Sequence, residues 1–379
     1  PRLPSLSSGW SPRSVSLVAQ ATRWTSSMGY HNPTMQVSFK VEVVAKALQV
    51  PWAIAFTPDG RLLFTERPGR VRVIEKDKLR DKPLAVIEDC AHRGEGGLMG
   101  LAIHPNFART RWLYLAYLYE QNGLKVRVVR YRDAGQSLVE PKTIIEGIQG
   151  NFVHNGTALG FGPDSKLYIT TGDAAQRELA QRLDRLEGKT LRLNDDGTIP
   201  RDNPFVNTTN ARPEIWSYGH RNAQGIDWQP GTGLMFQTEH GPSGFDGPGG
   251  GDEINIVERG KNYGWPVIHH RQTREGMVAP LIEFTPALAP SGCAFYRGNK
   301  IPTWRHNLFV ACLRGERLIR VVLKGREVVK TEPLLVNECG RLRAVVSGPD
   351  GLLYVSTSNR DGRGHPHPDD DRILRIVPI

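Results

Sequence analysis

Residues 51–74 read PWAIAFTPDGRLLFTERPGRVRVI. Apolar and polar residues alternate on both sides of Pro58-Asp59-Gly60, and alternation with period two is typical of a half-buried β-strand. Proline presets φ and glycine accepts the conformation of a tight reversal, so the segment predicts strands joined by a short turn. One such hairpin cannot bury its own apolar face, and it therefore needs neighbours.

The same pattern recurs along the chain. Pro163-Asp164-Ser165 and Pro349-Asp350-Gly351 occupy the turn position in two of the later copies. The five further copies cover residues 97–119 with 126–132, 157–173 with 189–194, 224–241 with 252–257, 293–323, and 342–360 with 372–377. Repetition of a unit that cannot bury a core alone indicates a repeat architecture.

Six such units predict an all-β fold, a six-bladed β-propeller over residues 39–379. A β-sandwich or double barrel is the alternative, which six near-copies of one unit disfavour. Residues 1–38 are rich in Ser, Pro and Thr and lack periodicity, which predicts a flexible leader or linker. Loops of several blades converge at one end of a propeller's axis, so we expect a ligand site on that axis.

Composition excludes several classes of protein. Lys and Arg total 49 against 39 Asp and Glu, giving a formal net charge of +10. No block of five or more basic residues exists, so we expect no nucleic-acid partner, and a small anionic ligand held by a few arginines fits better. No apolar run approaches the ~18 residues of a membrane span. A GxGxxG segment after a strand is missing, which disfavours a dinucleotide site, and none of the four cysteines forms a C-x-x-C pair.

The loops between the repeats carry the chemistry. They contain an acid, an imidazole and several arginines at equivalent places in successive copies, which puts them around one axis. These residues are Glu95 in HRGEGGLMG, His154 in NFVHNG, Arg221 and Asn222 in YGHRNAQG, Arg314 in ACLRGER, and Arg341 and Arg343 in GRLRAVV. An imidazole can take a proton near neutral pH, and arginines can hold a polyanion by bidentate hydrogen bonds.

The glycine-rich stretch 241–251 suggests a cation site. Exposed carbonyls beside Gly241 and Pro242, or the Asp252-Glu253 pair, offer the oxygen ligands that calcium prefers. A mobile loop is the alternative interpretation.

The same residues carry a family resemblance. The chain resembles the soluble glucose and aldose sugar dehydrogenases that depend on pyrroloquinoline quinone, and the likeness runs from about residue 50 to residue 379. The matching segments are VPWAIAFTPDG, GEGGLMGLAIHPNF, GFGPDSKLYITTGD, GKTLRLNDDGTIPRDNP, GHRNAQG, EHGPSG with GDEIN, GKNYGWP, GRLRAVVSGPDG and TSNRDGRG with DDRILRI. The family fold is a six-bladed propeller, in agreement with the repeat count.

The resemblance implies a role for each matching position. His154 matches the general base that takes the proton of the sugar's anomeric hydroxyl while hydride passes to the quinone, which would leave a lactone. Arg221 matches the arginine beside the reacting carbonyl. The positions that match cofactor-holding groups are Asn222, Arg341 and Arg343, and also Glu95 and Arg314, where the family pattern has Gln and Lys.

The family also implies calcium. Gly241 and Pro242 match backbone-carbonyl ligands of a calcium that polarises the quinone. Glu253 and the Tyr263 carbonyl match a second, structural calcium site. Glu95 departs from the family pattern, which has Gln at this position. A carboxylate near an anionic cofactor must be protonated, paired or calcium-bound.

Partners and location follow from the resemblance. We expect an aldose substrate of broad range, an external electron acceptor and a monomer, because the long insertions that make dimer contacts in some members look absent. A periplasmic or secreted protein is the family expectation. Two alternatives remain: a non-catalytic propeller that binds a protein or glycan, and a calcium-dependent lactonase on a similar propeller.

Overall fold

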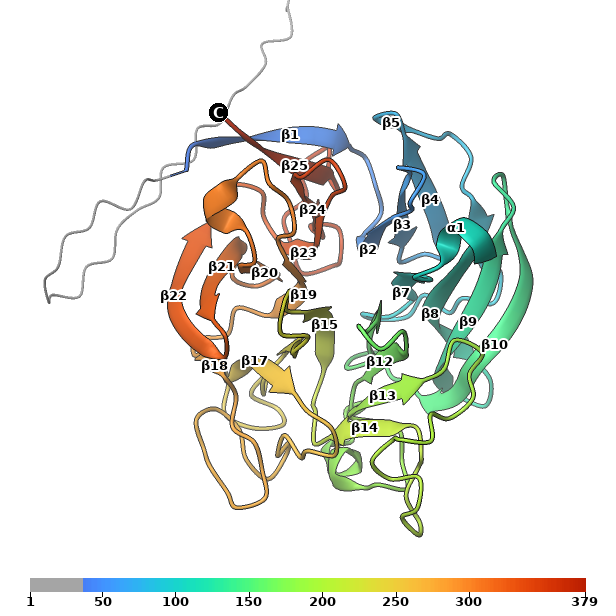
Figure 1. Ribbon diagram of the computed structural model, residues 1–379, viewed down its shortest axis with the longest axis vertical. Coiled ribbons are helices and arrows are strands. Elements are labelled where there is room, and N and C mark those ends of the chain that lie inside the picture. Colours follow the sequence, from blue (N-terminus) through green and yellow to red (C-terminus); the bar gives the residue numbers. More distant parts are fainter. Residues whose placement is uncertain (1–36) are drawn as a thin grey trace, which may run out of the picture.

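The computed structural model describes residues 37–379, which form six antiparallel β-sheets around one axis (Figure 1). This arrangement confirms the predicted six-bladed β-propeller. The predicted leader lies outside the described residues except for Val37 and Ser38. Each blade is numbered here by the repeat that forms it.

Blades one to three occupy the first half of the ring. Blade one contains β2 (Pro51–Phe56), β3 (Leu62–Glu66), β4 (Arg70–Glu75), β5 (Lys78–Leu79) and β6 (Ala85–Val86). Blade two contains β7 (Leu98–Ile103), β8 (Trp112–Glu120), β9 (Leu124–Asp133) and β10 (Leu138–Gln149). Blade three contains β11 (Gly156–Phe161), β12 (Leu167–Thr171), β13 (Lys189–Leu193) and β14 (Ile215–Tyr218).

Blades four to six complete the ring. Blade four contains β15 (Ala223–Trp228), β16 (Met235–Glu239), β17 (Asp252–Val257) and β18 (Ile282–Phe284). Blade five contains β19 (Pro290–Phe295), β20 (Leu308–Cys312), β21 (Arg317–Lys324) and β22 (Glu327–Leu334). Blade six contains β23 (Leu342–Ser347), β24 (Leu353–Thr357), β25 (Ile373–Pro378) and β1 (Phe39–Ala45).

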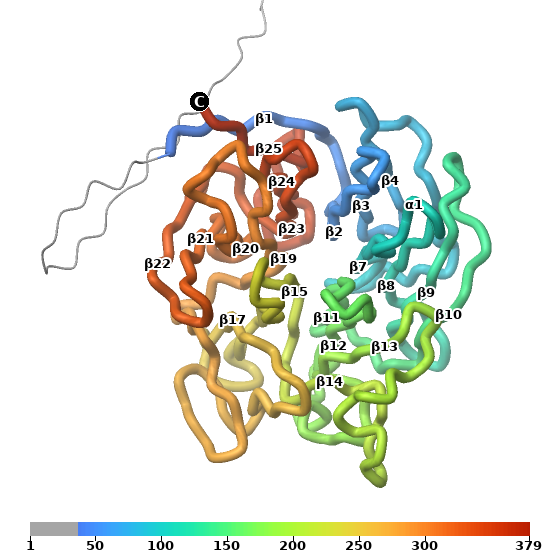
Figure 2. Tube along the Cα trace, in the orientation of Figure 1, coloured from blue at the N-terminus to red at the C-terminus, as the bar shows by residue number. Residues whose placement is uncertain are grey.

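The ring closes between the two ends of the described chain. Strand β1 pairs antiparallel with β25, with Phe39 opposite Pro378, so an N-terminal strand completes the last blade. The first strand of each blade lies nearest the axis, as Figure 2 shows for β2, β7, β11, β15, β19 and β23. Because the first strand of the described chain completes the last blade, both ends of that chain are held in one sheet.

The predicted turns join the first and second strands. The N–H of Gly60 donates to the Thr57 carbonyl (2.9 Å), and Gly351 donates likewise to Gly348 (3.1 Å). Both glycines have positive φ (85° and 81°), and Ser165 takes the equivalent place at 58°. These reversals send the chain outward into the second strand, which is buried along its length in β3, β12, β16, β20 and β24.

The core lies between the blades. One cluster joins Leu63 and Val71 of blade one to Leu101 and Leu115 of blade two, and similar clusters fill the other blade interfaces. Apolar burial on both faces of each blade supplies the main stabilisation of such a ring.

Every blade has a register break in the first strand pair. The breaks fall between Pro51 and Ile54, Leu98 and Leu101, Gly156 and Leu159, Ala223 and Gly225, Pro290 and Cys293, and Leu342 and Val345. A β-bulge bends the strand and redirects a side chain. The repeated bulge therefore determines which side chains the first strands present near the axis.

Helices are few and short. In the described part of the chain they are α1 (Phe107–Thr110) and the 3₁₀ helices η1 (Arg177–Gln181) and η2 (Pro302–Trp304). Within residues 37–379 no helix is long and apolar enough to cross a membrane. The cysteines Cys90, Cys293, Cys312 and Cys339 are all free thiols.

Candidate functional site

One end of the axis opens into a cavity of about 630 Å³. All six blades or the loops between them contribute to its lining. The lining includes nine of the residues singled out from the sequence: Glu95, His154, Arg221, Asn222, Gly241, Pro242, Arg314, Arg341 and Arg343. The loops thus converge on the axis as the repeat pattern predicts, although their chemical roles stay predictions.

His154 is buried and held by a carboxylate. Its Nδ1 lies 2.8 Å from Oδ1 of Asp173, which is itself fully buried just after β12. Oδ1 also accepts the Ala175 N–H (2.8 Å), while Oδ2 accepts the indole N–H of Trp265 (2.8 Å). Because every other neighbour of this carboxylate is a donor, Asp173 requires a proton on Nδ1, and Nε2 of His154 is left as a proton acceptor.

Arg221 is fixed by the loop after β16. Its Nε donates to Asp246 (2.7 Å), and its terminal nitrogens donate to the His240 carbonyl and the Ser243 hydroxyl (both 3.1 Å). Burial raises the pKa of Asp246, but the ion pair with Arg221 outweighs it and lowers that pKa overall. The guanidinium has five N–H groups, so two remain for a ligand.

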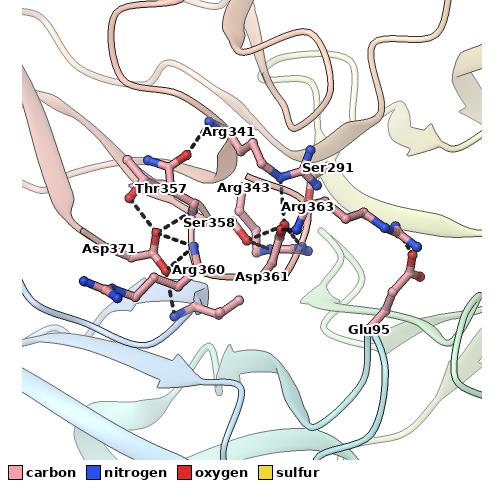
Figure 3. Close-up of polar contacts among 12 residues, drawn as sticks. Glu95, Ser291, Arg341, Arg343, Thr357, Ser358, Arg360, Asp361, Arg363 and Asp371 are labelled. Atoms are coloured by element: carbon pink, nitrogen blue, oxygen red, sulfur yellow. Dashed lines mark hydrogen bonds and ion pairs between the residues drawn. The ribbon is translucent and has the colours of Figure 1, made fainter. Parts of the chain in front are cut away.

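Blade six supplies a cluster of charges on one side of the cavity (Figure 3). Asp361 accepts from Arg341 Nε (2.9 Å) and the Ser358 hydroxyl (3.0 Å), and Arg343 lies 3.6 Å away. Burial alone would raise the pKa of Asp361, but Arg343 and Arg341 hold it below its usual range. Burial lowers the pKa of Arg343 to about 10, so the group remains a cation at neutral pH.

Glu95 has a cationic partner. Its Oε1 accepts a charge-assisted hydrogen bond from Arg363, which reaches across from the last blade to the loop before blade two (Figure 3). The carboxylate at this unusual position is therefore paired, one of the three conditions that the sequence requires of it.

The floor of the cavity consists of bulge residues. Arg343 in the bulge of blade six stacks on Trp52 in that of blade one, with its guanidinium carbon 3.7 Å from the ring centroid. Arg343 also donates to Oε1 of Gln224 (3.3 Å), in the bulge of blade four. The strand bulge thus places this arginine, and its Nε also donates to the Ser358 hydroxyl (2.9 Å) just after β24.

The lining has an excess of positive charge. Six arginines line the cavity against three carboxylates, those of Glu95, Asp252 and Asp361. Arg314 is exposed, and no ion pair to it occurs within the described residues. Asn222 is buried and its Oδ1 accepts the Gly156 N–H (3.0 Å), which leaves the amide N–H groups as donors. A multiply charged anion matches this lining.

Two cavity-lining side chains have a buried nitrogen without a partner in the described part of the chain: Nε of Arg67 and Nε2 of His240. A buried polar atom without a hydrogen bond is costly, and a ligand with an acceptor atom would supply the missing partner. Both nitrogens can be donors, which again fits an anion.

The candidate metal ligands fall into two places. Gly241 and Pro242 line the cavity, where the Pro242 carbonyl also accepts the Gly250 N–H (3.2 Å). Glu253 and Tyr263 are not among the lining residues. Within residues 37–379 no group of three or more His, Cys, Asp or Glu side chains forms a metal centre, so any cation here would rely on carbonyl oxygens as well.

Glu253 lies in a strongly acidic environment. It pairs in register with Glu239 across β16 and β17. Burial and the nearby carboxylate of Glu239 raise the pKa of Glu253 well above its usual value. Asn255 donates to Glu253 (2.8 Å), while its own Oδ1 is buried without a partner among the described residues. Two neighbouring carboxyl groups and an amide oxygen are ligands that suit a hard cation.

Sequence reasoning missed several residues of the site, among them Arg67, Asp173, Asp361 and Arg363. Asp173 ends the TTGD segment of the third copy, and an acid just beyond a buried strand is a usable signal. Asp361 and Arg363 lie in NRDGRG, which only the resemblance singled out.

Comparison with known proteins identifies the class. Residues 48–374 match the family described as glucose / sorbosone dehydrogenase, and the chain belongs to that family. The aldose sugar dehydrogenase YliI of Escherichia coli (strain K12) is 36% identical over 344 residues, which cover 85% of this chain and 91% of the relative.

Solved structures of sugar dehydrogenases share the fold of this chain. The pyrroloquinoline-quinone-bound aldose sugar dehydrogenase of Streptomyces coelicolor superposes with a TM-score of 0.80 at 33% identity, covering 92% of this chain and all of that one. A putative glucose dehydrogenase of Thermus thermophilus gives a TM-score of 0.83 at 44% identity, covering 89% of this chain and all of that one.

Proposed function

We propose that this protein is an aldose sugar dehydrogenase that depends on pyrroloquinoline quinone and calcium and oxidises the anomeric carbon of its substrate to a lactone. The observation that carries the proposal is the juxtaposition of the His154–Asp173 pair with an arginine-rich cavity on the axis. Family membership supports the same conclusion.

The lining fits the cofactor. Pyrroloquinoline quinone carries three carboxylates, and the excess of arginine over acid in the cavity offers matching charge. Arg341 and Arg343 are held in fixed positions, and Asn222 keeps free donors, so these residues would hold the quinone. When bound, the quinone supplies the hydride acceptor that no side chain can provide.

His154 acts as the general base. Its Nε2 takes the proton of the anomeric hydroxyl, and the charge that develops on the ring is stabilised by Asp173 through Nδ1 (2.8 Å). Asp173 is a positioning residue, because it contacts the base and not the sugar. Arg221 supplies two N–H groups for oxygen atoms that gain negative charge during the reaction.

Calcium has two proposed places. The carbonyls of Gly241 and Pro242 would hold a cation at the cavity wall, where it would act as a Lewis acid. Glu253 and the Tyr263 carbonyl would hold a second ion of structural function, which would relieve the repulsion between Glu253 and Glu239.

Family membership suggests the oligomeric state, the substrate range, the electron acceptor and the cellular location. We expect a monomer with a broad aldose range that passes electrons to an external acceptor and works in the periplasm or as a secreted protein. A non-catalytic glycan-binding propeller would have no use for a carboxylate-held imidazole beside an anion site, and a lactonase would need a central cluster of carboxylate ligands that the described cavity lacks.

Reconstitution tests the proposal. Apo-protein is loaded with pyrroloquinoline quinone and calcium, and dye reduction is followed with a panel of aldoses and with gluconolactone as a control. We expect turnover with several aldoses only when the quinone is present. No turnover with any aldose at saturating quinone would overturn the proposal, and lactone hydrolysis without quinone would favour the lactonase.

A further inference from the structure

Arg67 differs from the other buried arginines of the cavity. Its side chain makes one weak hydrogen bond, from a terminal nitrogen to the Asp361 carbonyl (3.4 Å), and its Nε is buried without a partner in the described part of the chain. No carboxylate within residues 37–379 forms an ion pair with it, whereas Arg221, Arg341 and Arg343 each face an acid. The residue is only 7% exposed.

The backbone holds Arg67 firmly in place. Its N–H donates to the Val50 carbonyl (3.2 Å), and its carbonyl accepts the Leu98 N–H of the next blade (2.9 Å). Gly97 packs so closely that a Cβ there would lie 2.1 Å from the Arg67 carbonyl oxygen. The backbone of Arg67 is therefore fixed at the junction of blades one and two, which holds the base of its side chain at the cavity.

Register shows why this position faces the axis. Arg67 follows Glu66, which pairs with Pro51 at the start of β2. His240 follows Glu239, which pairs with Ala223 at the start of β15. The two residues are thus equivalent positions of blades one and four, opposite each other in a ring of six blades. Both line the same cavity, and each has a buried nitrogen without a partner in the described part of the chain.

The cost of this arrangement indicates an anionic ligand. Burying a guanidinium without a counter-charge is unfavourable, and burial lowers the pKa of Arg67 as a consequence. The remote carboxylates of Asp361 and Glu95 offset only part of this cost, and Asp361 is already shared by Arg341 and Arg343. A ligand carboxylate would restore both the missing charge and the missing acceptor.

We propose that Arg67 binds a carboxylate of the tricarboxylate quinone through its guanidinium group, a contact that neither the sequence motifs nor the resemblance assigns. This inference rests on the proposed function, since it takes pyrroloquinoline quinone as the ligand. Arg67 thereby supplies a buried positive charge to the ligand.

Equilibrium binding of the quinone tests this proposal without turnover. Apo-protein is titrated with pyrroloquinoline quinone at fixed calcium, and the dissociation constant is read from absorbance. We expect Arg67→Gln to raise the dissociation constant about tenfold to a hundredfold, the effect of losing a charge-assisted hydrogen bond. Arg67→Lys keeps the charge but loses the planar guanidinium with its paired donors, so we expect a smaller increase.

Arg72→Gln is the matched control. Nε of Arg72 is likewise buried without a described partner, but the residue lies on β4 away from the cavity lining. We expect its dissociation constant to equal that of the parent. Thermal unfolding verifies that each variant is folded. If Arg67→Gln does not fold, the dissociation constant of Arg67→Lys is compared with that of the parent instead.

The outcomes separate the two proposals. A parent chain that does not bind the quinone contradicts the proposed function and the role of Arg67 together. A parent that binds it, with Arg67→Gln and Arg67→Lys binding equally well, contradicts the role of Arg67 alone. Weakening by Arg72→Gln as large as that by Arg67→Gln would show a general stability effect and would also overturn it.

Discussion

The two ends of the propeller axis have cavities of about the same volume, roughly 630 Å³, and very different chemistry. The end described above is lined by six arginines, two histidines and three carboxylates. The opposite end is lined mainly by apolar side chains such as Phe161, Ile226 and Trp228. Its charged residues are Asp227 and Arg297, and these satisfy each other at 2.7 and 2.8 Å.

The same strands lead to both ends, so the difference comes from the connections. Tight turns such as Pro58-Asp59-Gly60 close the apolar end and leave few residues to carry chemistry. The other end receives the bulges of the first strands and the longer loops, including residues 240–251. The strands therefore form cavities of about equal volume at both ends, and the loops between the strands make only one of these cavities suitable for an anion.

The largest expected effect concerns the base. His154→Ala removes the proton acceptor and leaves the arginines in place, so we expect turnover to fall by about 10² to 10⁴-fold while quinone affinity stays the same. Steady-state kinetics and an absorbance titration measure the two quantities. An unchanged rate would refute the role of His154.

The next effect concerns the orientation of that base. Asp173→Asn places an amide N–H group against a donor in either rotamer, because the carboxylate now accepts from His154, Ala175 and Trp265. We expect kcat to fall about 10²-fold, a large part of what a general base contributes.

The quinone affinity of Asp173→Asn separates positioning from collapse of the site. We expect it to match that of the parent, since the arginines are untouched. A variant with normal kcat, or one whose loss lies wholly in quinone binding, would contradict the assignment.

A paired substitution then tests the contrast between the two ends. Arg343→Gln removes a buried cation from the cavity floor, and we expect quinone affinity to drop by about tenfold to a hundredfold. Arg297→Gln makes the same change at the apolar end, where we expect quinone affinity to stay constant. Equal losses in the two variants would mean that the charge difference between the ends does not select the ligand.

The smallest effect is on stability. Calcium removal with a chelator should lower the unfolding midpoint by a few degrees, because Glu253 and Glu239 are then left facing each other. Glu253→Gln removes one of these charges, so its midpoint should not respond to calcium. A midpoint in the parent that is indifferent to calcium would exclude the structural ion.

Sequence patterns predicted the inner part of each blade and not the outer part. Alternation and Pro-Asp-Gly-type turns mark the first three strands of a copy, because those strands are buried. The outermost strands lack this pattern: β22 (Glu327–Leu334) is mostly exposed, and its EVVKTEPL contains proline and several charges. The closing strand β1 is far in sequence from its partner β25, so nothing local reveals the pairing.

The site shows the same limit. His154 and Arg343 were recognisable because they stand at equivalent places in their sequence copies, although the structure puts Arg343 in a strand bulge and not in a loop. Asp173 and Arg67 belong to the site because of contacts with residues that are distant in sequence. Asp173 accepts a hydrogen bond from Trp265, and Arg67 donates one to the Asp361 carbonyl. Only the folded ring brings these groups together, which is why sequence reasoning passed over them.

The most direct measurement is the stoichiometry of quinone binding at the charged end. Apo-protein, Arg343→Gln and Arg297→Gln are titrated with pyrroloquinoline quinone and calcium under identical conditions. We predict one quinone per chain for the parent and for Arg297→Gln, with clearly weaker binding for Arg343→Gln. Absence of binding by the parent, or weakening by Arg297→Gln instead of Arg343→Gln, would contradict the assignment of this cavity.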